Sequence, residues 1–504
     1  MTLVEAFMQD GSRVCSRVGQ AAMASALSGI LSACAVGPNF HEPATPDVAG
    51  YVGTPLPATT ASADTPLGDA QQFLKGAAVP VRWWTGFSSA ELDRRVDEAL
   101  AHSPTIASAQ AALRQARENV SAARGGLLPS LDASAGVTRQ KQSGAAFGGA
   151  IAFPPLTVYN ASVDVGYTLD LFGGVRRGVE AQAAAADFHA YELDGTYLSL
   201  AANVATASFR EGSLRGQIAA TEDIIDAYQK QLDLVERQHE IGAKSLADVL
   251  AIRTQLATAR AQLPGLRRQL AQTQTQLAVY LGRFPSQAQF AAMDLDSLTL
   301  PREVPVSLPS ALVRQRPDIR AAEAQLHQAT AAVGVATANL FPQITLSASF
   351  GSQALRADDL FSGGSRTWSV GAGLLQPIFH GGSLRAQKRA SEAALDKAVA
   401  DYRQTVLTAF QNVADSLRAL ELDAENLKAQ AEAEQSAEHS LGLVRTQYKD
   451  GAANYLQVLD ATRQYEQARI GVVQARAARL SDTAALYTAL GGDWEHKPEV
   501  ALRR

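Results

Sequence analysis

The sequence Arg316-Pro317-Asp318-Ile319 opens a segment that ends at Phe341-Pro342-Gln343-Ile344, and an earlier stretch repeats this arrangement. The earlier stretch opens at Ser103-Pro104-Thr105-Ile106 and ends at Leu128-Pro129-Ser130-Leu131. Inside each segment, apolar residues recur at seven-residue steps, and the two series match at one offset of about 213 residues. The matched positions are Ile106, Leu113, Val120 and Leu127 against Ile319, Leu326, Val333 and Leu340. Matches at a fixed offset indicate an internal duplication.

Later landmarks of the two halves correspond as well. Gly173-Gly174 in the first half matches Gly381-Gly382 in the second, and Gly242-Ala243 matches Gly451-Ala452. Each half therefore predicts the same series of elements, which is a helix, two strands and two very long helices.

The bulk composition is that of an ordinary folded protein. The 504 residues are 46% hydrophobic and 19% charged, with a formal net charge of −5, and no basic patch points to nucleic acid. No run of eighteen strongly apolar residues follows the N-terminal region, so a membrane-spanning helix is not expected. If the chain crosses a membrane, it must do so with strands.

The N-terminus has the pattern of an export signal. Arg13 and Arg17 precede a weakly apolar run at 21–30, and Leu31-Ser32-Ala33-Cys34 resembles the lipobox of bacterial lipoproteins. This predicts cleavage before Cys34 and lipidation of its sulfur and amine, with residues 37–76, rich in Pro, Thr, Ala and Gly, as a flexible tether. The alternative is a small buried cysteine in a helix. The other cysteine precedes Cys34, so no disulfide is expected in the mature chain.

Four stretches alternate apolar and polar residues with period two. The longest is 159–171, and the others are 131–137, 344–350 and 368–374. One apolar and one polar face is the pattern of an outer-membrane barrel strand. Four strands cannot close a barrel by themselves, and open edges in lipid leave backbone groups unpaired. We therefore expect copies of the chain to close the barrel together. The alternative is a soluble sheet with one face in water.

The long helices predict a coiled coil. Residues 174–241 and 384–450 each run for about 67–68 residues without proline, which is about 100 Å of helix. After the first of these, a heptad series continues through Val249, Leu256, Leu263, Leu270 and Leu277. The matching series in the second half is interrupted by Arg479 and Asp482.

Three motifs resemble one known family. Cys34-Ala35-Val36-Gly37-Pro38-Asn39-Phe40, Trp83-Trp84-Thr85-Gly86-Phe87, and the block from Arg316-Pro317-Asp318-Ile319 to Glu323 resemble the TolC-like outer membrane efflux proteins. In particular they are similar to the lipoprotein branch often called NodT-type, found in efflux systems of the resistance-nodulation-division (RND) class. The resemblance covers nearly the whole chain from Cys34 to about Trp494.

The resemblance implies an α+β membrane protein that works as a homotrimer. Each chain would give four strands to a twelve-stranded transmembrane β-barrel, which a long periplasmic coiled-coil barrel of helices continues. Such trimers are exit ducts of tripartite pumps. They receive drugs or other toxic compounds from an inner-membrane RND-type transporter through a periplasmic adaptor protein and conduct them passively across the outer membrane.

The expected organisation follows the duplication. It is a signal peptide at 1–33, a lipidated tether and equatorial segment at 34–90, a first repeat at 91–290, a linker at 291–308, a second repeat at 309–494 and a tail at 495–504.

Two sets of candidate working residues follow from the resemblance. The turns between long helices would contact the adaptor through Gly242, Ala243, Lys244, Ser245, Gly451, Ala452, Ala453 and Asn454. The alternative is that these residues only cap helices. The periplasmic gate would comprise Tyr448, Leu456, Asp460 and Arg463.

The spacing of the last three gate residues puts them on one helix face. Three copies of Asp460 around a common axis would form an acidic ring, and Leu456 an apolar one. The alternative is an exposed ion pair worth less than about 1 kcal/mol.

No catalytic constellation accompanies these features. The eight histidines are scattered without the spacing of metal ligands, so no enzyme activity, metal or cofactor is expected. Two other functions remain open. One is an outer-membrane duct for a type I polypeptide secretion system, and the other is a periplasmic coiled-coil lipoprotein without a pore.

Overall fold

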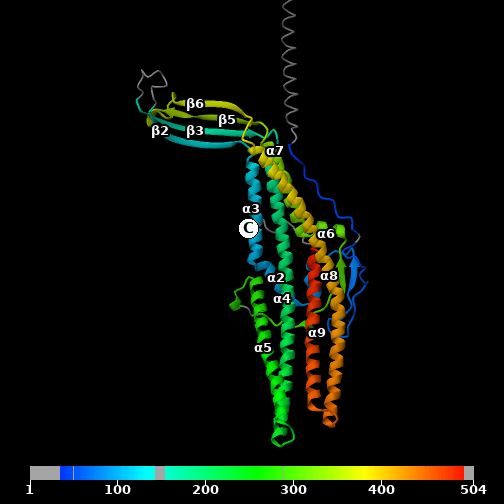
Figure 1. Cartoon of the computed structure of the whole chain (residues 1–504). Coiled ribbons are helices and arrows are strands. Elements are labelled where there is room, and N and C mark those ends of the chain that lie inside the picture. The colour runs from blue at the N-terminus through cyan, green and yellow to red at the C-terminus, as the bar shows by residue number, and fades with distance from the viewer. Residues whose placement is uncertain (1–34, 49, 142–153, 288, 493–504) are drawn as a thin grey trace, which may run out of the picture. The chain divides into compact units, whose positions relative to one another are not determined.

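The structure is a computed structural model that describes residues 35–48, 50–141, 154–287 and 289–492 (Figure 1). Cys34, the expected signal peptide and the expected C-terminal tail lie outside these residues. The chain divides into two compact units. The first contains the residues up to Glu42 with Arg114–Asp187 and Glu323–Asp401, and the second contains Pro43–Leu113, Phe188–Ala322 and the residues from Tyr402.

A four-stranded antiparallel sheet in the first unit contains the strands expected from the sequence. Its order is β2 (Ser130–Gln140), β3 (Leu156–Leu169), β5 (Gln343–Ala354) and β6 (Arg366–Leu375). Each half of the chain supplies one hairpin, and the β3–β5 pairing joins the halves. A short 3-10 helix, η5 (Ala357–Asp359), lies in the connection between β5 and β6.

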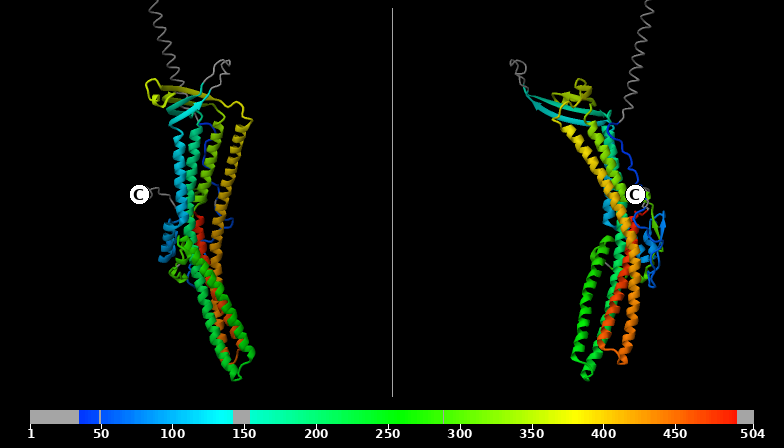
Figure 2. Two further views of the ribbon diagram at one scale, coloured as in Figure 1. Left: turned by 90° about the vertical axis from the view of Figure 1, so that its left-hand side faces the viewer. Right: turned by 45° about the vertical axis from the view of Figure 1, so that its right-hand side comes forward.

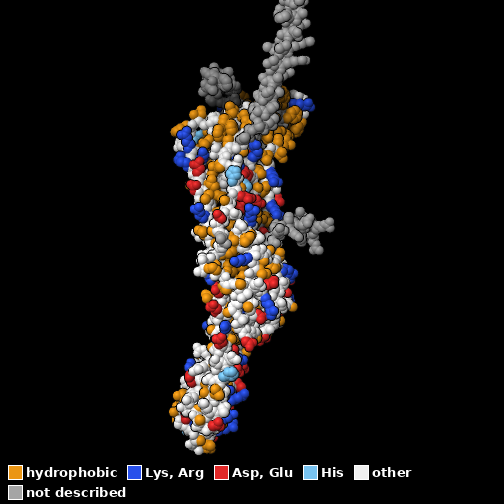
Figure 3. Space-filling view, turned by 90° about the vertical axis from the view of Figure 1, so that its right-hand side faces the viewer, with side chains coloured by type: hydrophobic (Ala, Val, Ile, Leu, Met, Phe, Trp, Pro, Cys, Tyr) orange, Lys and Arg blue, Asp and Glu red, His pale blue; other side chains and the backbone are white. Residues whose placement is uncertain are grey.

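The strand register separates an apolar face from a polar one. Val163 is paired with Ala133 on one side and Phe350 on the other, so these side chains share a face. The same face carries exposed apolar side chains on both outer strands: Leu131, Val137, Trp368, Val370 and Leu374. Hydrophobic side chains gather around the strands in the space-filling view (Figure 3). The alternation predicted from the sequence is thus present across the whole sheet.

Strands β2 and β6 form the edges of this sheet, and within the described residues each pairs with a single neighbour. An edge strand presents a row of unpaired N–H and C=O groups. In hydrocarbon each unpaired group costs several kcal/mol. An apolar sheet with two open edges is therefore incomplete as a single copy.

The duplication reappears as helices of equal length. Helices α3 (Pro104–Gly125) and α7 (Pro317–Ala338) have 22 residues each, and both begin with proline, which suits the first helical position. Helices α4 (Gly174–Glu240) and α8 (Ser383–Lys449) have 67 each. Helices α5 (Leu246–Tyr280) and α9 (Tyr455–Ala489) have 35 each and return antiparallel beside α4 and α8 (Figure 2). None of the helices within the described ranges has the length and apolar character needed to span a membrane.

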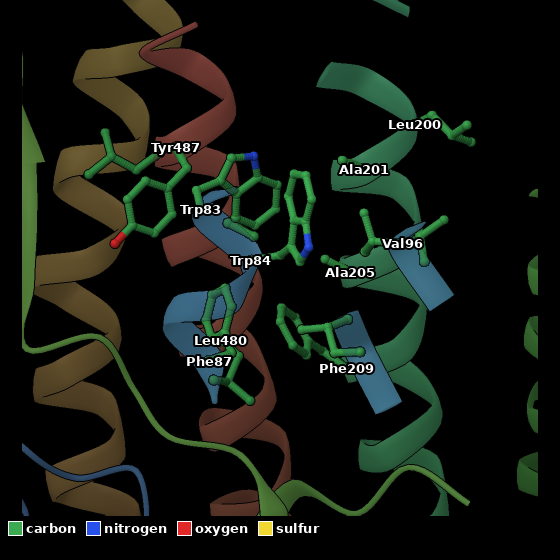
Figure 4. Close-up of a cluster of buried hydrophobic side chains, with 14 of the residues drawn as sticks. Trp83, Trp84, Phe87, Val96, Leu200, Ala201, Ala205, Phe209, Leu480 and Tyr487 are labelled. Carbon is green, nitrogen blue, oxygen red and sulfur yellow. The ribbon is translucent and has the colours of Figure 1, made fainter. Parts of the chain in front are cut away.

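The main core of the second unit is built around the tryptophan motif. Trp83, Trp84 and Phe87 form the 3-10 helix η1 (Trp83–Phe87) and are almost completely buried (Figure 4). The Trp83 ring stacks on Tyr487 with centroids 5.6 Å apart, and Phe87 packs against Phe209 at 4.9 Å. A motif recognised as a landmark in the sequence is therefore a packing element that joins α4 and α9.

Short elements of the second unit surround this core. They are α2 (Ala90–His102), α6 (Pro309–Gln315), η3 (Pro285–Gln287), η4 (Leu295–Ser297), and a two-stranded parallel sheet of β1 (Gln72–Lys75) and β4 (Glu303–Val306). Apart from α2, which has 13 residues, these elements are too short for a periodic signal.

The prediction of a flexible tether over 37–76 is wrong for the part in the second unit. The Tyr51 hydroxyl donates to the carbonyl of Ser307 at 3.0 Å, and Thr60 N donates to Gln71 O at 2.9 Å. The fully buried Arg479 donates to the carbonyls of Leu67 and Asp69. These bonds fix the segment and explain why a charged residue interrupts the apolar series of α9.

Candidate functional site

Two turns join the long helices, and each combines a left-handed glycine with a capping residue. In the turn between α4 and α5, Gly242 has φ 78°, and Ser245 Oγ accepts a hydrogen bond from Asp248 N while the Asp248 carboxylate accepts one from Ser245 N. In the turn between α8 and α9, Gly451 has φ 77°, and Asn454 forms the same kind of capping box. Glycine suits this backbone region because it has no Cβ.

The residues predicted to contact an adaptor are largely accessible. Gly242, Ala243, Ser245, Gly451, Ala452 and Asn454 are exposed, whereas Lys244 and Ala453 are half-buried. A Cβ added at Gly242 or Gly451 would meet no atom within 4 Å. The capping interpretation therefore explains the shape of the turns, but it leaves their outer surface free.

Three of the four predicted gate residues share an exposed face of α9. Arg463 Nη2 donates to Asp460 Oδ1 at 2.8 Å, and each side chain is 53% exposed. The second carboxylate oxygen accepts from Gln464 at 2.7 Å. Leu456 is 69% exposed one turn before Asp460. The ion pair therefore forms within one chain, and its strength there is limited by solvent.

The fourth predicted gate residue, Tyr448, makes a different set of contacts. Its ring lies 5.6 Å from that of Tyr455, and the Lys244 ammonium lies 5.2 Å from the Tyr448 ring centre and 5.6 Å from the Tyr455 ring centre. A cation in such a position is attracted by the negative faces of the rings. Lys244, in the turn between α4 and α5, thus contacts the two tyrosines that flank the turn between α8 and α9. The spacing of these residues in the sequence does not reveal this contact.

A buried apolar cluster lies between the helices that lead into the turns. Its members are Ile224, Tyr228, Leu232, Val235, Val249, Ile252, Leu256, Ala259, Tyr455 and Leu459, from α4, α5 and α9. Sequence reasoning missed the acidic residue beside it, Glu466. Burial raises the pKa of the Glu466 carboxyl to about 7, although a hydrogen bond from Tyr228 and the charge of Arg445 oppose the rise.

The surface of this region combines charged, apolar and aromatic side chains. It offers an exposed ion pair, an exposed leucine and a cation held by two aromatic rings. Among the described residues there is no cluster of His, Cys, Asp and Glu able to hold a metal ion.

The matching family model is that of the outer membrane efflux proteins, and it covers residues 96–283 and 308–492. The chain belongs to this family. The two matched stretches contain the two halves of the duplication. The block from Arg316 to Glu323 lies in the second stretch, the motif Trp83–Phe87 shortly precedes the first, and the motif Cys34–Phe40 lies further upstream. The family is one of channel proteins rather than enzymes.

Two relatives are similar to this chain over most of their length. The pyoverdine export outer membrane protein OpmQ of Pseudomonas aeruginosa is 35% identical over 430 residues, which are 84% of this chain and 90% of OpmQ. The probable efflux pump outer membrane protein TtgC of Pseudomonas putida is 32% identical over 92% of this chain and 94% of TtgC.

Solved structures share the fold. The outer-membrane channel OprN superposes with a TM-score of 0.79 at 28% identity and covers 92% of this chain and 100% of its own. VceC of Vibrio cholerae gives a TM-score of 0.76 at 27% identity over 82% of this chain and 99% of its own.

These similarities confirm the fold class, location and function expected from the sequence. The chain is an outer-membrane efflux protein with the fold of the trimeric TolC-like channels. They support an efflux duct and not the secretion-system alternative.

Proposed function

We propose that three copies of this chain form the exit duct of a tripartite pump for small toxic molecules. A periplasmic adaptor protein would join the duct to an inner-membrane RND-type transporter, which supplies the energy. The observation that carries the proposal is the sheet: four strands, apolar on one face, with two edges left to pair with other copies.

The duct itself is not expected to choose the cargo. The names of three relatives refer to pyoverdine, to antibiotics and to toluene. One fold serving such different compounds supports a passive conduit in which selection is made by the transporter.

The lipid anchor and the boundaries of the segments belong to the same proposal. Residues 1–33 would be removed as a signal peptide, and Cys34 would carry the lipid. Residues 91–290 and 309–494 would act as the two repeats, linked by 291–308. This division is supported by the helices, because each repeat contains one helix of 22 residues, one of 67 and one of 35.

The turns would meet the adaptor through the tip residues, Gly242 to Ser245 and Gly451 to Asn454. Most of these residues are exposed and, apart from Lys244, they have small side chains, which would permit close backbone approach by a helical partner. The gate would be formed by Tyr448, Leu456, Asp460 and Arg463 of three copies.

The gate is tested by single-channel conductance of the purified trimer in planar bilayers. Asp460→Ala combined with Arg463→Ala is expected to raise conductance severalfold, because the charged constriction loses both members. The matched control is Glu236→Ala with Arg253→Ala, an exposed pair at 2.6 Å near the first turn. Equal conductance in the wild type and both double variants would remove the gate assignment, and no conductance under any condition would remove the duct.

A further inference from the structure

Residues 35–40 lie against the strand–helix junction of the first unit. Val36 N donates to the carbonyl of Phe172 at 3.1 Å, in the turn between β3 and α4. At Gly173, where φ is 75°, an added Cβ would lie 2.5 Å from the Cβ of Ala35. The segment and the turn are therefore in direct contact, with no room for a side chain between them.

Arg177 on α4 binds the segment at two points. Its Nη2 donates to Asn39 Oδ1 at 2.6 Å, and its Nε donates to the carbonyl of Val36 at 3.4 Å. Its third nitrogen, Nη1, pairs with Glu180 Oε2 at 2.7 Å, and the arginine side chain is only 6% exposed. One buried guanidinium thus uses its planar fork to hold both a backbone and a side-chain oxygen.

Helix α7 supplies the other wall. The Phe40 ring stacks on His327 with centroids 4.3 Å apart and an angle of 16° between the planes. His327 Nε2 lies 2.9 Å from Glu180 Oε1, so Glu180 links the groups that hold Asn39 and Phe40. Gly37 has φ 93°, and a Cβ on it would lie 2.5 Å from the Cα of Gly334 on α7. This contact requires glycine at position 37, whereas a Cβ added at Gly334 would lie 2.8 Å from Cγ of Arg177.

We propose that Arg177, Glu180, His327 and Gly334 form a docking site for residues 35–40 of the same chain, and that this N-terminal dock fixes the lipid anchor at the foot of the barrel strands. Residues 35–40 occupy this site in the structure. They are bound through a backbone hydrogen bond, a charge-assisted hydrogen bond and a ring stack.

The dock limits the distance that the lipid anchor can reach from the folded protein. If residues 35–50 were free, a tether of about sixteen residues would let the lipid range over roughly 20–25 Å from Tyr51, the first residue of the segment that is bonded in the second unit. In the dock, the residue that follows Cys34 touches the turn between β3 and α4. Phe172 in this turn also stacks on Phe341, just before β5, at 4.7 Å. The acyl chains would therefore enter the membrane at the level where the strands end, without stretching the tether. This membrane consequence rests on the proposed lipidation of Cys34, whereas the dock itself does not.

Chymotrypsin cleavage after Phe40 in the purified full-length trimer tests the dock. The ring stacked on His327 cannot enter a protease pocket until the segment leaves, so the wild type is expected to resist. Asn39→Ala removes one charge-assisted hydrogen bond and should speed appearance of a chain starting at His41 by about tenfold. Asn39→Asp keeps an acceptor for Arg177 and should cleave as slowly as the wild type.

Further variants separate the dock from folding and from the duct function. Asn39 is exposed, so its replacement does not disturb the core. Arg177→Ala should accelerate cleavage as Asn39→Ala does, while Arg389→Ala on the exposed face of α8 should not. Cys34→Ala should leave Phe40 protected even without lipid, and channel conductance reports the duct independently. Cleavage of the wild type as fast as Asn39→Ala, or equal protection in Asn39→Ala and Arg177→Ala, would overturn the proposal.

Discussion

At the residue scale, Glu466 is an acidic side chain near the turns whose pKa is raised towards neutrality. It lies on α9 beside the apolar cluster that supports the gate, and its Oε1 is buried without a hydrogen-bond partner. Tyr228 of α4 and Arg445 of α8 face it. A carboxyl group in such a place favours its neutral form, because burial penalises the charge.

This environment predicts a pH dependence of stability. The pKa of Glu466 rises from 4.5 to about 7 on folding, so the unfolded chain loses its proton first as pH increases. The free energy of unfolding should therefore fall between about pH 4.5 and pH 7 and level off above. Glu466→Gln removes this contribution. Thermal unfolding followed by circular dichroism should show a smaller loss of melting temperature from pH 5 to pH 8 in the variant.

Two comparisons make this measurement specific. Burial also raises the pKa of Asp423 to about 7, beside Asp482, so the wild-type profile contains more than one group. The difference between wild type and Glu466→Gln isolates one of them. Glu425→Gln, at an exposed position of α8, should retain the wild-type profile. Identical profiles for all three proteins would contradict the assignment.

At the element scale, the sequence was informative wherever a pattern was long. Strands with period two and helices with heptads were predicted because each residue's face follows from spacing alone. The short elements were missed because tertiary contacts form them. The helix at Trp83–Phe87 exists to bury its aromatic rings, and Arg479 on α9 breaks a heptad to reach the carbonyls of Leu67 and Asp69.

The candidate site likewise has one part that the sequence predicts and one part that it does not. The common face of Leu456, Asp460 and Arg463 followed from their spacing on one helix. The contact of Lys244 with Tyr448 could not be predicted, because it joins residues of different repeats about two hundred positions apart.

This contact predicts that the two turns move together. Lys244→Met keeps much of the side-chain volume but loses the cation, so the hold on Tyr448 and Tyr455 should weaken. Hydrogen exchange of the α8–α9 turn should become faster in the variant, although the substitution lies in the other repeat. Lys244→Arg should retain slow exchange.

Lys230→Met is the matched control for this experiment. Lys230 is an exposed lysine of α4 that pairs with Asp226, and its loss should leave the turn unchanged. If the α8–α9 turn exchanges equally fast in wild type and Lys244→Met, the two turns are independent.

At the scale of the whole molecule, the sheet register determines what a closed barrel would display inside. One row across the sheet pairs Asp132 with Asp164, Asp164 with Ser349, and Ser349 with Ser369. The apolar side chains lie on the opposite face, which must meet lipid. In a trimer the polar row becomes a ring in the lumen, with two carboxylates from each copy.

Like charges directly opposite in neighbouring strands repel each other. The Ser162 hydroxyl donates to Asp164 at 2.8 Å and stabilises its charge, but the pair still creates a negative field across the pore. Such a ring concentrates cations. This prediction is tested in trimers that also carry Asp460→Ala and Arg463→Ala, so that the proposed gate is open. Asp132→Asn with Asp164→Asn should shift the reversal potential of these trimers, measured across a potassium chloride gradient, towards that of a non-selective pore. Ser369 lies in the same row but carries no charge, so Ser369→Ala should leave the potential unchanged. Unaltered cation preference in the double asparagine variant would mean that selectivity arises elsewhere along the duct.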